Sequence, residues 1–378
     1  MTKGKLVFEE IDPESLERNQ TSFLKESPAA SDVQRYTTTW LLLLIVMAFI
    51  MVGVGGITRL TDSGLSIVEW DLIGGILPPF SQSEWELQFE QYKSIPEFSL
   101  VNSAMTIDEF KTIFYWEWGH RLWGRLIGLV WLAGFLTFTL RQKNRGKWTL
   151  KLFLVGILIG FQGLVGWLMV RSGLSGEMTD VASYWLAIHL GLAFSLIALM
   201  QWYYLTLKKS QADLLSRRRN RDRRLNLLVN FFIFVLIIQV IMGALVAGID
   251  AGKSYNDWPL MAGEIYPSDY FFHHDSLVDF LENPAFVQFN HRVTAYLLLI
   301  VVIMTWFASR RSPIPFVRSI YSLLLCLVTV QLVLGIVTVV KGATIEVAIL
   351  HQLLGLVLWI FTIWVRFETS YPRRYSFA

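Results

Sequence analysis

Eight long apolar segments constrain this 378-residue chain more than any other feature. Each is long enough to cross a bilayer, which takes about 20 mostly apolar residues. Within a membrane the backbone must satisfy its own hydrogen bonds, so the pattern predicts an all-α integral membrane protein with eight transmembrane helices. The segments are 39–58, 118–140, 150–170, 183–206, 226–249, 287–308, 317–340 and 345–366.

The connections between these segments alternate in charge. The connection 207–225 alone holds eight basic residues. Basic loops stay in the cytoplasm, so both termini are predicted to be cytoplasmic and the long loops 59–117 and 250–286 to face outward. The first 38 residues are acidic and lack an apolar stretch, so neither a transit peptide nor a signal peptide is visible. This favours a bacterial cytoplasmic (inner) membrane over the mitochondrial inner membrane.

The two halves of the chain repeat one another. "VGGITRLTDSGLSIVEW" (54–70) aligns without a gap with "MGALVAGIDAGKSYNDW" (242–258), and "GHR" (119–121) aligns with "NHR" (290–292). Each half has four apolar segments, so both have the same orientation in the membrane, and we expect two tandem four-helix bundles. The predicted parts are a cytoplasmic tail 1–38, an N-terminal bundle 39–206, a basic cytoplasmic linker 207–225, a C-terminal bundle 226–366 and a cytoplasmic tail 367–378.

Three glutamines stand four residues before a glycine inside the apolar segments. They are Gln162, Gln239 and Gln331. Small residues let membrane helices approach closely, and amides hydrogen-bond across helices. We interpret these residues as helix-packing positions rather than as direct ligands.

Two further residue types carry little weight in the sequence. His273 and His274 fall in a polar outer loop and are interpreted as solvated residues. Cys326 is the single cysteine, which excludes an intrachain disulfide and a cysteine-based metal site.

The other four histidines occupy repeat-related places in the apolar segments. His120 and His291 open the second and sixth segments, and His189 and His351 lie in the outer part of the fourth and eighth. Polar residues within membrane spans usually mark function. A structural zinc site needs four donors together, whereas two facing imidazoles in a four-helix bundle suit a six-coordinate haem. All four lie near the outer face, so two side-by-side haems would make a poor electron conduit across the bilayer.

Four arginines at the outer face are candidate contacts for haem propionates. Arg121 and Arg292 directly follow two of the histidines, and a guanidinium matches the geometry of a carboxylate. Their alternative role is to extend to the lipid headgroups. Arg59 and Arg125 are the further candidates, and they have no basic counterpart in the other half.

One carboxylate distinguishes the two halves. Glu117 precedes His120 by three residues and so shares its helical face, while the aligned residue in the second half is Gln288. This asymmetry indicates one working site and one supporting site. The alternative is a headgroup-level carboxylate paired with Arg121 or Arg125.

The chain resembles haem A synthase, the membrane enzyme that oxidises the C8 methyl of haem O to a formyl group. The resemblance covers about residues 40 to 366 and rests on several motifs together: "GGITRLTDSGLSIVEW", the prolines 78–79, "EWGHR", "DAGKSYNDWPLM", "NHR" and "LHQLLG". It implies an oxidoreductase that makes haem A for terminal oxidases by successive hydroxylation.

The resemblance also assigns roles to the residues found above. It implies that His120 and His189 flank the substrate haem iron and that Glu117 serves the chemistry there. His291 and His351 would be the axial ligands of a resident haem b. Many bacterial members carry cysteine pairs in the outer loops, and this chain does not, so it resembles the cysteine-free branch shared with mitochondria.

Expected partners follow from this resemblance. They are haem O as substrate, haem O synthase and oxidase assembly factors, and membrane lipids; no nucleic acid is expected. The electron acceptor, the origin of the formyl oxygen and a homo-oligomeric state are left open. The alternative functions are a di-haem b electron-transfer protein without methyl oxidation, and a haem transporter or chaperone. The asymmetry between Glu117 and Gln288 favours the enzyme.

Overall fold

The structure is a computed structural model that describes residues 28–71, 73–141, 146–174, 178–271 and 276–373. Within these residues, eight helices have the length and composition needed to cross a membrane, which confirms the prediction of an all-α multi-pass membrane protein. They are α2 (Pro28–Leu60), α5 (Ile107–Arg141), α6 (Lys147–Gly173), α7 (Ser183–Leu207), α9 (Arg223–Gly248), α11 (Pro284–Ser309), α12 (Pro315–Val340) and α13 (Ile345–Ser370).

Two of these helices begin well before their apolar segments. α2 begins at Pro28 and α5 at Ile107, eleven residues before the predicted starts at 39 and 118 in each case. At 1.5 Å per residue, the 35 residues of α5 span about 52 Å, against about 30 Å for the hydrocarbon core. Hydropathy marks the membrane part of a helix and misses polar turns outside it. Glu117 and His120 therefore lie in internal turns of α5 rather than at its entrance.

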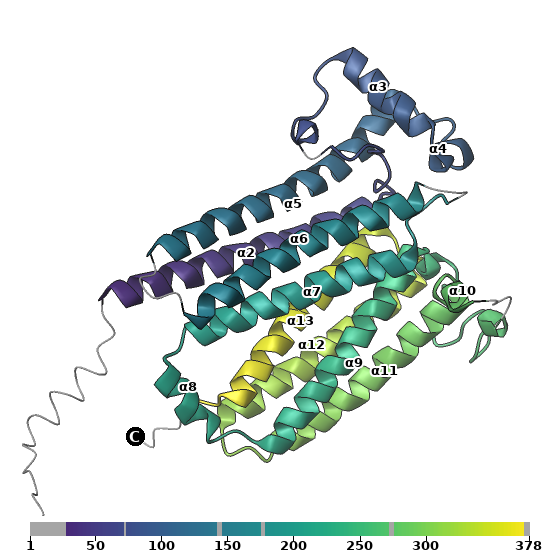
Figure 1. Ribbon diagram of the computed structural model, residues 1–378. Coiled ribbons are helices and arrows are strands. Elements are labelled where there is room, and N and C mark those ends of the chain that lie inside the picture. Colours follow the sequence, from purple (N-terminus) through teal and green to yellow (C-terminus); the bar gives the residue numbers. More distant parts are fainter. Residues whose placement is uncertain (1–27, 72, 142–145, 175–177, 272–275, 374–378) are drawn as a thin grey trace, which may run out of the picture.

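The eight helices pack as two groups of four (Figure 1). Helices α2, α5, α6 and α7 contact one another in the first half, and α9, α11, α12 and α13 do so in the second. The halves meet where α7 packs on α9 and α13 and where α2 packs on α13. This arrangement is consistent with the expected pair of tandem bundles.

Buried hydrogen bonds tie the two halves together in the membrane region. Gln201 Nε2 donates to Ile360 O at 2.8 Å, and Gln352 Nε2 donates to Val52 O at 2.7 Å. A single cluster of buried apolar side chains runs through both halves. The bundles therefore form one continuous core rather than two separate domains.

The predicted outer loop 59–117 is largely a folded cap. It contains η1 (Gly74–Ile76), α3 (Gln82–Lys93), α4 (Pro96–Leu100) and the first turns of α5. Ser81 and Glu84 form a capping box that begins α3. Aromatic side chains of α3 pack on those of α5 and bury a separate apolar cluster: Trp85, Phe89, Tyr92, Phe110 and Phe114 are its aromatic members. Figure 1 shows α3 and α4 beside the N-terminal end of α5.

The basic linker lies at the opposite end of the molecule. It contains α8 (Gln211–Arg218), near which α2 begins and α13 ends (Figure 1). The second outer loop carries η2 (Ala251–Lys253), η3 (Ser268–Phe271) and α10 (Leu277–Leu281). Most of the tail 1–38, much of the tail 367–378, and His273 and His274 lie outside the described residues.

Candidate functional site

The repeat seen in the sequence is also present in the backbone. Asp62 follows the end of α2 and its aligned partner Asp250 follows the end of α9. Both residues adopt the left-handed conformation, with φ of 48° and 51°. Aspartate tolerates this conformation better than most residues because its short side chain bonds locally. The two halves therefore leave the membrane through the same turn.

Each of the four membrane histidines stands on a glycine of a neighbouring helix. His120 on α5 faces Gly55 on α2, and His189 on α7 faces Gly166 on α6. The second half repeats this with His291 of α11 on Gly243 of α9 and His351 of α13 on Gly335 of α12. A Cβ at any of the four glycines would lie 2.9 to 3.1 Å from the ring, so a larger residue there would push the ring out of its present position.

The two histidines of the second half face each other at a distance that fits an iron between them. The ring centroids of His291 and His351 lie 6.5 Å apart, with an interplanar angle of 79°. A metal held by two imidazoles separates their centroids by about 6.3 Å, from a metal–nitrogen distance of about 2 Å on each side. The spacing is that of a bis-histidine haem.

Unsatisfied ring nitrogens support the same interpretation. The Nδ1 atoms of His189 and His291 are buried and have no hydrogen-bond partner in the protein. A buried polar group without a partner is costly, so such atoms mark a place where a ligand completes the bonding. The residues of the second half therefore fit a haem site, and in the first half His120 and His189 occupy the repeat-related positions on α5 and α7.

Glu117 is buried and surrounded by donors. Its Oε1 accepts from Arg121 Nη2 at 2.6 Å, and its Oε2 accepts from Ser66 Oγ and from the Ile67 backbone N–H, both at 2.8 Å. The side chain is 3% exposed. The pairing with Arg121 that the sequence left open as an alternative is therefore present. It leaves Oε1 with capacity for one further proton or donor.

Gln288 occupies the same place in the second half with acceptors around it. Its Nε2 donates to Ala251 O at 3.0 Å and to Tyr255 O at 3.1 Å, while its Oε1 accepts from Arg292 Nη2 at 3.1 Å. By the repeat alignment, Tyr255 corresponds to Ile67 of the first half. The same frame thus surrounds a carboxylate with N–H and O–H groups in one half and an amide with carbonyls in the other.

The other arginines near the histidines are tied to backbone carbonyls. Arg121 also donates to Ile67 O at 2.8 Å, and Arg125 donates to Asp71 O at 2.9 Å. Arg292 donates to Leu260 O at 2.8 Å. Nη1 of Arg125 and Nε of Arg292 are buried without a protein partner, so these two arginines keep a donor for an anion.

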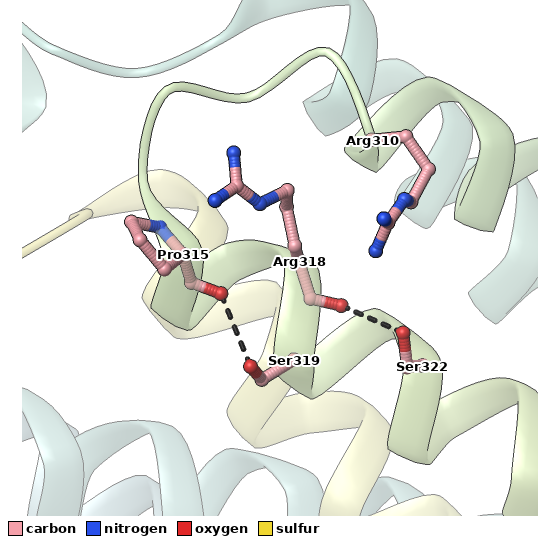
Figure 2. A pocket seen from close by; sticks show the side chains of 5 residues that line it. All are labelled: Arg310, Pro315, Arg318, Ser319 and Ser322. Atoms are coloured by element: carbon pink, nitrogen blue, oxygen red, sulfur yellow. Dashed lines mark hydrogen bonds between the residues drawn. The ribbon is translucent and has the colours of Figure 1, made fainter.

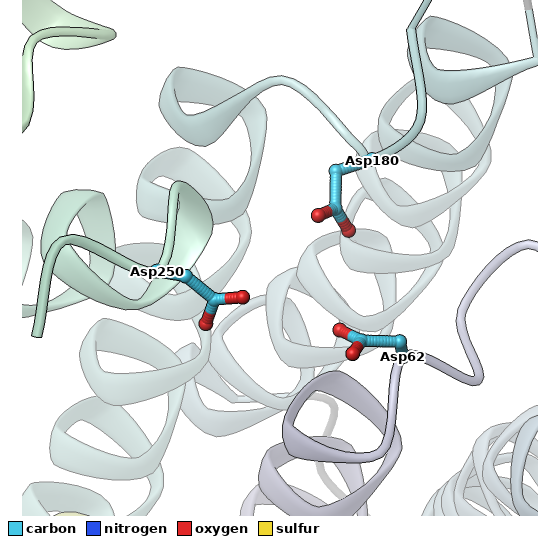
Figure 3. A group of neighbouring side chains, drawn as sticks. All are labelled: Asp62, Asp180 and Asp250. Atoms are coloured by element: carbon cyan, nitrogen blue, oxygen red, sulfur yellow. The ribbon is translucent and has the colours of Figure 1, made fainter. Parts of the chain in front are cut away.

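Arg59 lies in a different setting, beside three aspartates. Figure 3 shows these aspartates, Asp62, Asp180 and Asp250, pointing toward one another. Its guanidinium lies 2.6 Å from Asp62, 3.5 Å from Asp180 and 3.7 Å from Asp250. It also donates to Gly248 O at 3.2 Å, which belongs to the second half. The carboxylates come together closely enough to hold a metal ion, but Arg59 already supplies the positive charge there. Arg59 joins the two halves where α2 and α9 end.

Two acidic groups outside the membrane helices hold their protons unusually tightly. Burial, followed by the neighbouring Asp180, raises the pKa of Glu97 in α4 to about 8. Burial also raises the pKa of Asp180 to about 6, against the opposing effect of Arg59. Glu97 Oε2 is buried without a hydrogen-bond partner. Glu97 therefore keeps its proton at neutral pH.

A separate pocket lies far from the histidines. Figure 2 shows it between the end of α11 and the start of α12, lined by Arg310, Arg318, Pro315, Ser319 and Ser322. Arg310 follows His291 by 19 residues of α11, or about 28 Å along the helix. This pocket belongs to the basic end of the bundle and is not part of the histidine sites.

Some contributors to these sites were not singled out in the sequence. Ser66 and Ile67, which donate hydrogen bonds to Glu117, lie inside the repeated motif 54–70. No residue type in that motif predicts a contact with an acidic side chain. The helix-packing interpretation of Gln162 and Gln331 is confirmed by bonds across helices, to His189 O at 2.9 Å and His351 O at 3.0 Å. That these bonds reach the histidines was not expected.

Comparison with known proteins identifies the family. A family described as "Cytochrome oxidase assembly protein" matches residues 38–363. "Heme A synthase" of Roseobacter denitrificans is 42% identical over 98% of each chain, and that of Dinoroseobacter shibae is 43% identical over 98% of this chain and 97% of its own. The same-named protein of Paracoccus denitrificans is 45% identical over 88% of this chain and 87% of its own. The chain belongs to the haem A synthase family. The family is haem-associated, which agrees with the paired histidines.

Proposed function

We propose that this chain is a haem A synthase that oxidises the C8 methyl of haem O to a formyl group. The observation that carries the proposal is the pair of equivalent histidine sites with a carboxylate beside only one of them. Glu117 lies one turn from His120, while Gln288 takes its place near His291. The names of the relatives, at 42–45% identity over most of the chain, point to the same reaction.

In this proposal the first half binds the substrate and the second half retains a cofactor. His120 and His189 would hold the iron of haem O, and His291 and His351 would hold that of a resident haem b. The resident haem, when bound, provides a redox centre for electrons removed from the methyl carbon. Arg121, Arg125 and Arg292 hold propionates, with Arg59 as a further candidate.

Glu117 is the proton-handling group of the substrate site. Turning a methyl into an aldehyde removes protons as well as electrons from one carbon, and a positioned carboxylate can accept or release such protons. Arg121, Ser66 and Ile67 fix its two oxygens, so the carboxylate has a defined orientation. A carboxylate held in this way can also stabilise positive charge that develops nearby.

The surroundings of the enzyme follow from the charge pattern. We place it in the cytoplasmic membrane of a bacterium, with both termini and the linker 207–225 in the cytoplasm and both haem sites near the outer face. Haem O synthase, oxidase assembly factors and membrane lipids are its partners. The bundles correspond to 39–206 and 226–366.

The test is the haem composition of cells. The chain is expressed in a strain that makes haem O but lacks its own haem A synthase, and extracted haems are separated by chromatography. We expect haem A to form. If the protein reaches the membrane with haem b bound and the cells still contain only haem b and haem O, the oxidation proposal fails and electron transfer alone remains.

A further inference from the structure

Three of the four membrane histidines share a second neighbour besides the glycine. One turn before Gly166, Gly243 and Gly335 stand Gln162, Gln239 and Gln331. The fourth histidine, His120, stands on Gly55, and one turn before Gly55 the chain has Met51 instead. A glutamine therefore accompanies three of the four membrane histidines. The exception is His120, the histidine that lies beside Glu117.

Each of the three glutamines hydrogen-bonds to its histidine. Gln162 Nε2 donates to His189 O at 2.9 Å. Gln331 Nε2 donates to His351 O at 3.0 Å and lies 3.3 Å from Nδ1 of that ring.

In the third pair, Gln239 Nε2 lies 3.3 Å from His291 Nε2. The amide oxygens of all three glutamines are buried without a partner. Each of these histidines therefore has an amide beside it whose oxygen is still free to accept a hydrogen bond. For His189 and His291, the ring Nδ1 is also without a partner. The amides of Gln239 and Gln331 can orient the rings directly, and that of Gln162 fixes the backbone that carries the His189 ring.

The orientation of the rings separates the same three histidines from the fourth. A Cβ at Gly166, Gly243 or Gly335 would meet Cε1 of the ring first, at 2.9, 2.9 and 3.0 Å, with Nδ1 and Nε2 farther away. A Cβ at Gly55 would instead meet Nε2 of His120 first, at 3.1 Å. The three rings with a glutamine share one pose, and the ring without one is turned differently.

Met51 gives His120 no equivalent bond. A thioether has no donor and is a weak acceptor, so it cannot replace an amide. Its methyl group packs instead toward Gly124, where a Cβ would lie 3.3 Å from Met51 Cε. Within the described residues no hydrogen bond reaches the His120 ring, whereas Gln239 and Gln331 lie 3.3 Å from ring nitrogens of His291 and His351, and Gln162 bonds to the backbone of His189.

We propose that Gln162, Gln239 and Gln331 are positioning residues for three axial histidines, and that His120, which has no amide partner, is the exchangeable ligand. This inference rests on the proposed function and extends it. Groups that hydrogen-bond to metal ligands typically change metal affinity 10- to 100-fold. Two fixed ligands suit a haem that stays, and one fixed and one exchangeable ligand suit a haem that enters as substrate and leaves as product. The distribution of the amides thus assigns retention to the second half and turnover to the first.

The decisive variant is Met51→Gln. It places a glutamine beside His120, as Gln162, Gln239 and Gln331 are placed beside the other histidines, and it changes the side-chain volume little. The readout is the rate at which the purified protein, loaded with haem, loses it to an excess of apomyoglobin, followed by absorbance. We expect release from the first half to slow about 10-fold or more, with the haem b content unchanged. Met51→Leu, which keeps the site apolar, is the matched control and should release haem at the wild-type rate.

The reverse change tests the same inference independently of whether Met51→Gln folds. Gln162→Met should speed release from the first half, and Gln239→Met should lower haem b retention in the second, each by about 10-fold or more. If Met51→Gln and Gln162→Met both release haem at the wild-type rate while binding haem b normally, the inference is wrong.

The outcome is separable from that of the proposed function. If Met51→Gln slows haem release but no protein of the series forms haem A, the positioning role stands and the oxidation proposal fails. If His120→Ala leaves the release of haem from the first half unchanged, His120 is not a ligand and the inference fails, whatever the yield of haem A. If Met51→Gln and Gln162→Met both release haem at the wild-type rate and haem A still forms normally, the inference is rejected and the proposed function stands.

Discussion

Glu117 and Gln288 occupy equivalent positions of the two halves, and the hydrogen bonds around them run in opposite directions. Glu117 accepts from Ser66 Oγ and the Ile67 N–H, whereas Gln288 donates to the carbonyls of Ala251 and Tyr255. Each also accepts from an arginine four residues later in its helix. The backbone of each outer loop therefore selects the side chain it faces, and the two halves are not interchangeable at this position.

Glu117→Gln should abolish most of the activity. The amide group would face either Arg121 or the Ile67 N–H, both donors, so the variant loses a hydrogen bond as well as the charge, at about 1–3 kcal/mol. Loss of proton transfer is typically worth 10²–10⁴-fold in rate. The measurement is haem A formed per mole of haem b-loaded protein, which removes the contribution of misfolding.

Ser66→Ala is the control for this variant. It removes one donor to the same carboxylate but keeps the charge, and we expect a loss of less than 10-fold. Near-normal turnover per loaded molecule in Glu117→Gln would show that the carboxylate is structural.

His291→Ala and His351→Ala should each remove most of the low-spin haem b spectrum of the purified protein. The two rings lie 6.5 Å apart, so each provides one side of the same site. His120→Ala, in the other half, should leave that spectrum in place. The reduced-minus-oxidised absorbance of the three variants decides the matter, and a full low-spin spectrum in both second-half variants would contradict the assignment.

Arg59→Gln should weaken the contact between the two halves. It leaves Asp62, Asp180 and Asp250 close together without the cation between them, and we expect a loss of about 1–3 kcal/mol in the free energy of unfolding. The double variant with Asp180→Asn should recover part of this loss, because one repelling charge is removed. Thermal unfolding in detergent measures both.

Arg171→Gln provides the matched control for Arg59. Arg171 lies at the end of α6 over the ring of Trp167, and its loss should change stability little. If Arg59→Gln loses haem with unchanged stability, Arg59 is a propionate contact rather than a link between the halves.

Glu97 should make stability fall as the pH rises. Its pKa is about 8 in the folded protein and about 4.5 without the fold, so the folded state binds its proton more tightly. The free energy of unfolding therefore decreases between about pH 4.5 and 8. The decrease is a few kcal/mol, because each unit of pKa difference corresponds to about 1.4 kcal/mol. Thermal midpoints measured from pH 6 to 9 avoid the range in which Asp180 contributes.

Glu97→Gln should flatten this pH dependence and stabilise the protein above pH 8. Glu90→Gln is the control, because Glu90 is exposed and paired with Lys93 at 2.7 Å. An unchanged slope in Glu97→Gln would show that another group carries the titration.

A protease site inserted after Asn220 should be cut only from the cytoplasmic side. Asn220 lies in an exposed turn between α8 and α9, so an insertion there interrupts neither helix. The surrounding basic residues are the reason for the expected orientation. Cleavage in intact cells from outside would reverse the topology and place every histidine near the inner face.

The sequence by itself determined the number of membrane helices, the two-fold repeat and the paired histidines. Hydropathy and the spacing of the repeats are properties of the order of residues along the chain. Both can be recognised without knowing which side chains contact one another. The extension of α5 back to Ile107 and the folding of the cap 59–117 were missed, because polar helical turns outside the membrane have no hydropathy signal.

Only the tertiary structure decided what each polar residue binds. Glu117 could have paired with Arg121 or Arg125 by spacing, and the approach of the loop carrying Ser66 and Ile67 selected Arg121. Arg59 was a propionate candidate by position, but the ends of α2 and α9 and the segment before α7 bring three aspartates around it. Hydrogen-bond partners are set by the geometry of segments far apart in sequence, and residue type alone does not carry that information.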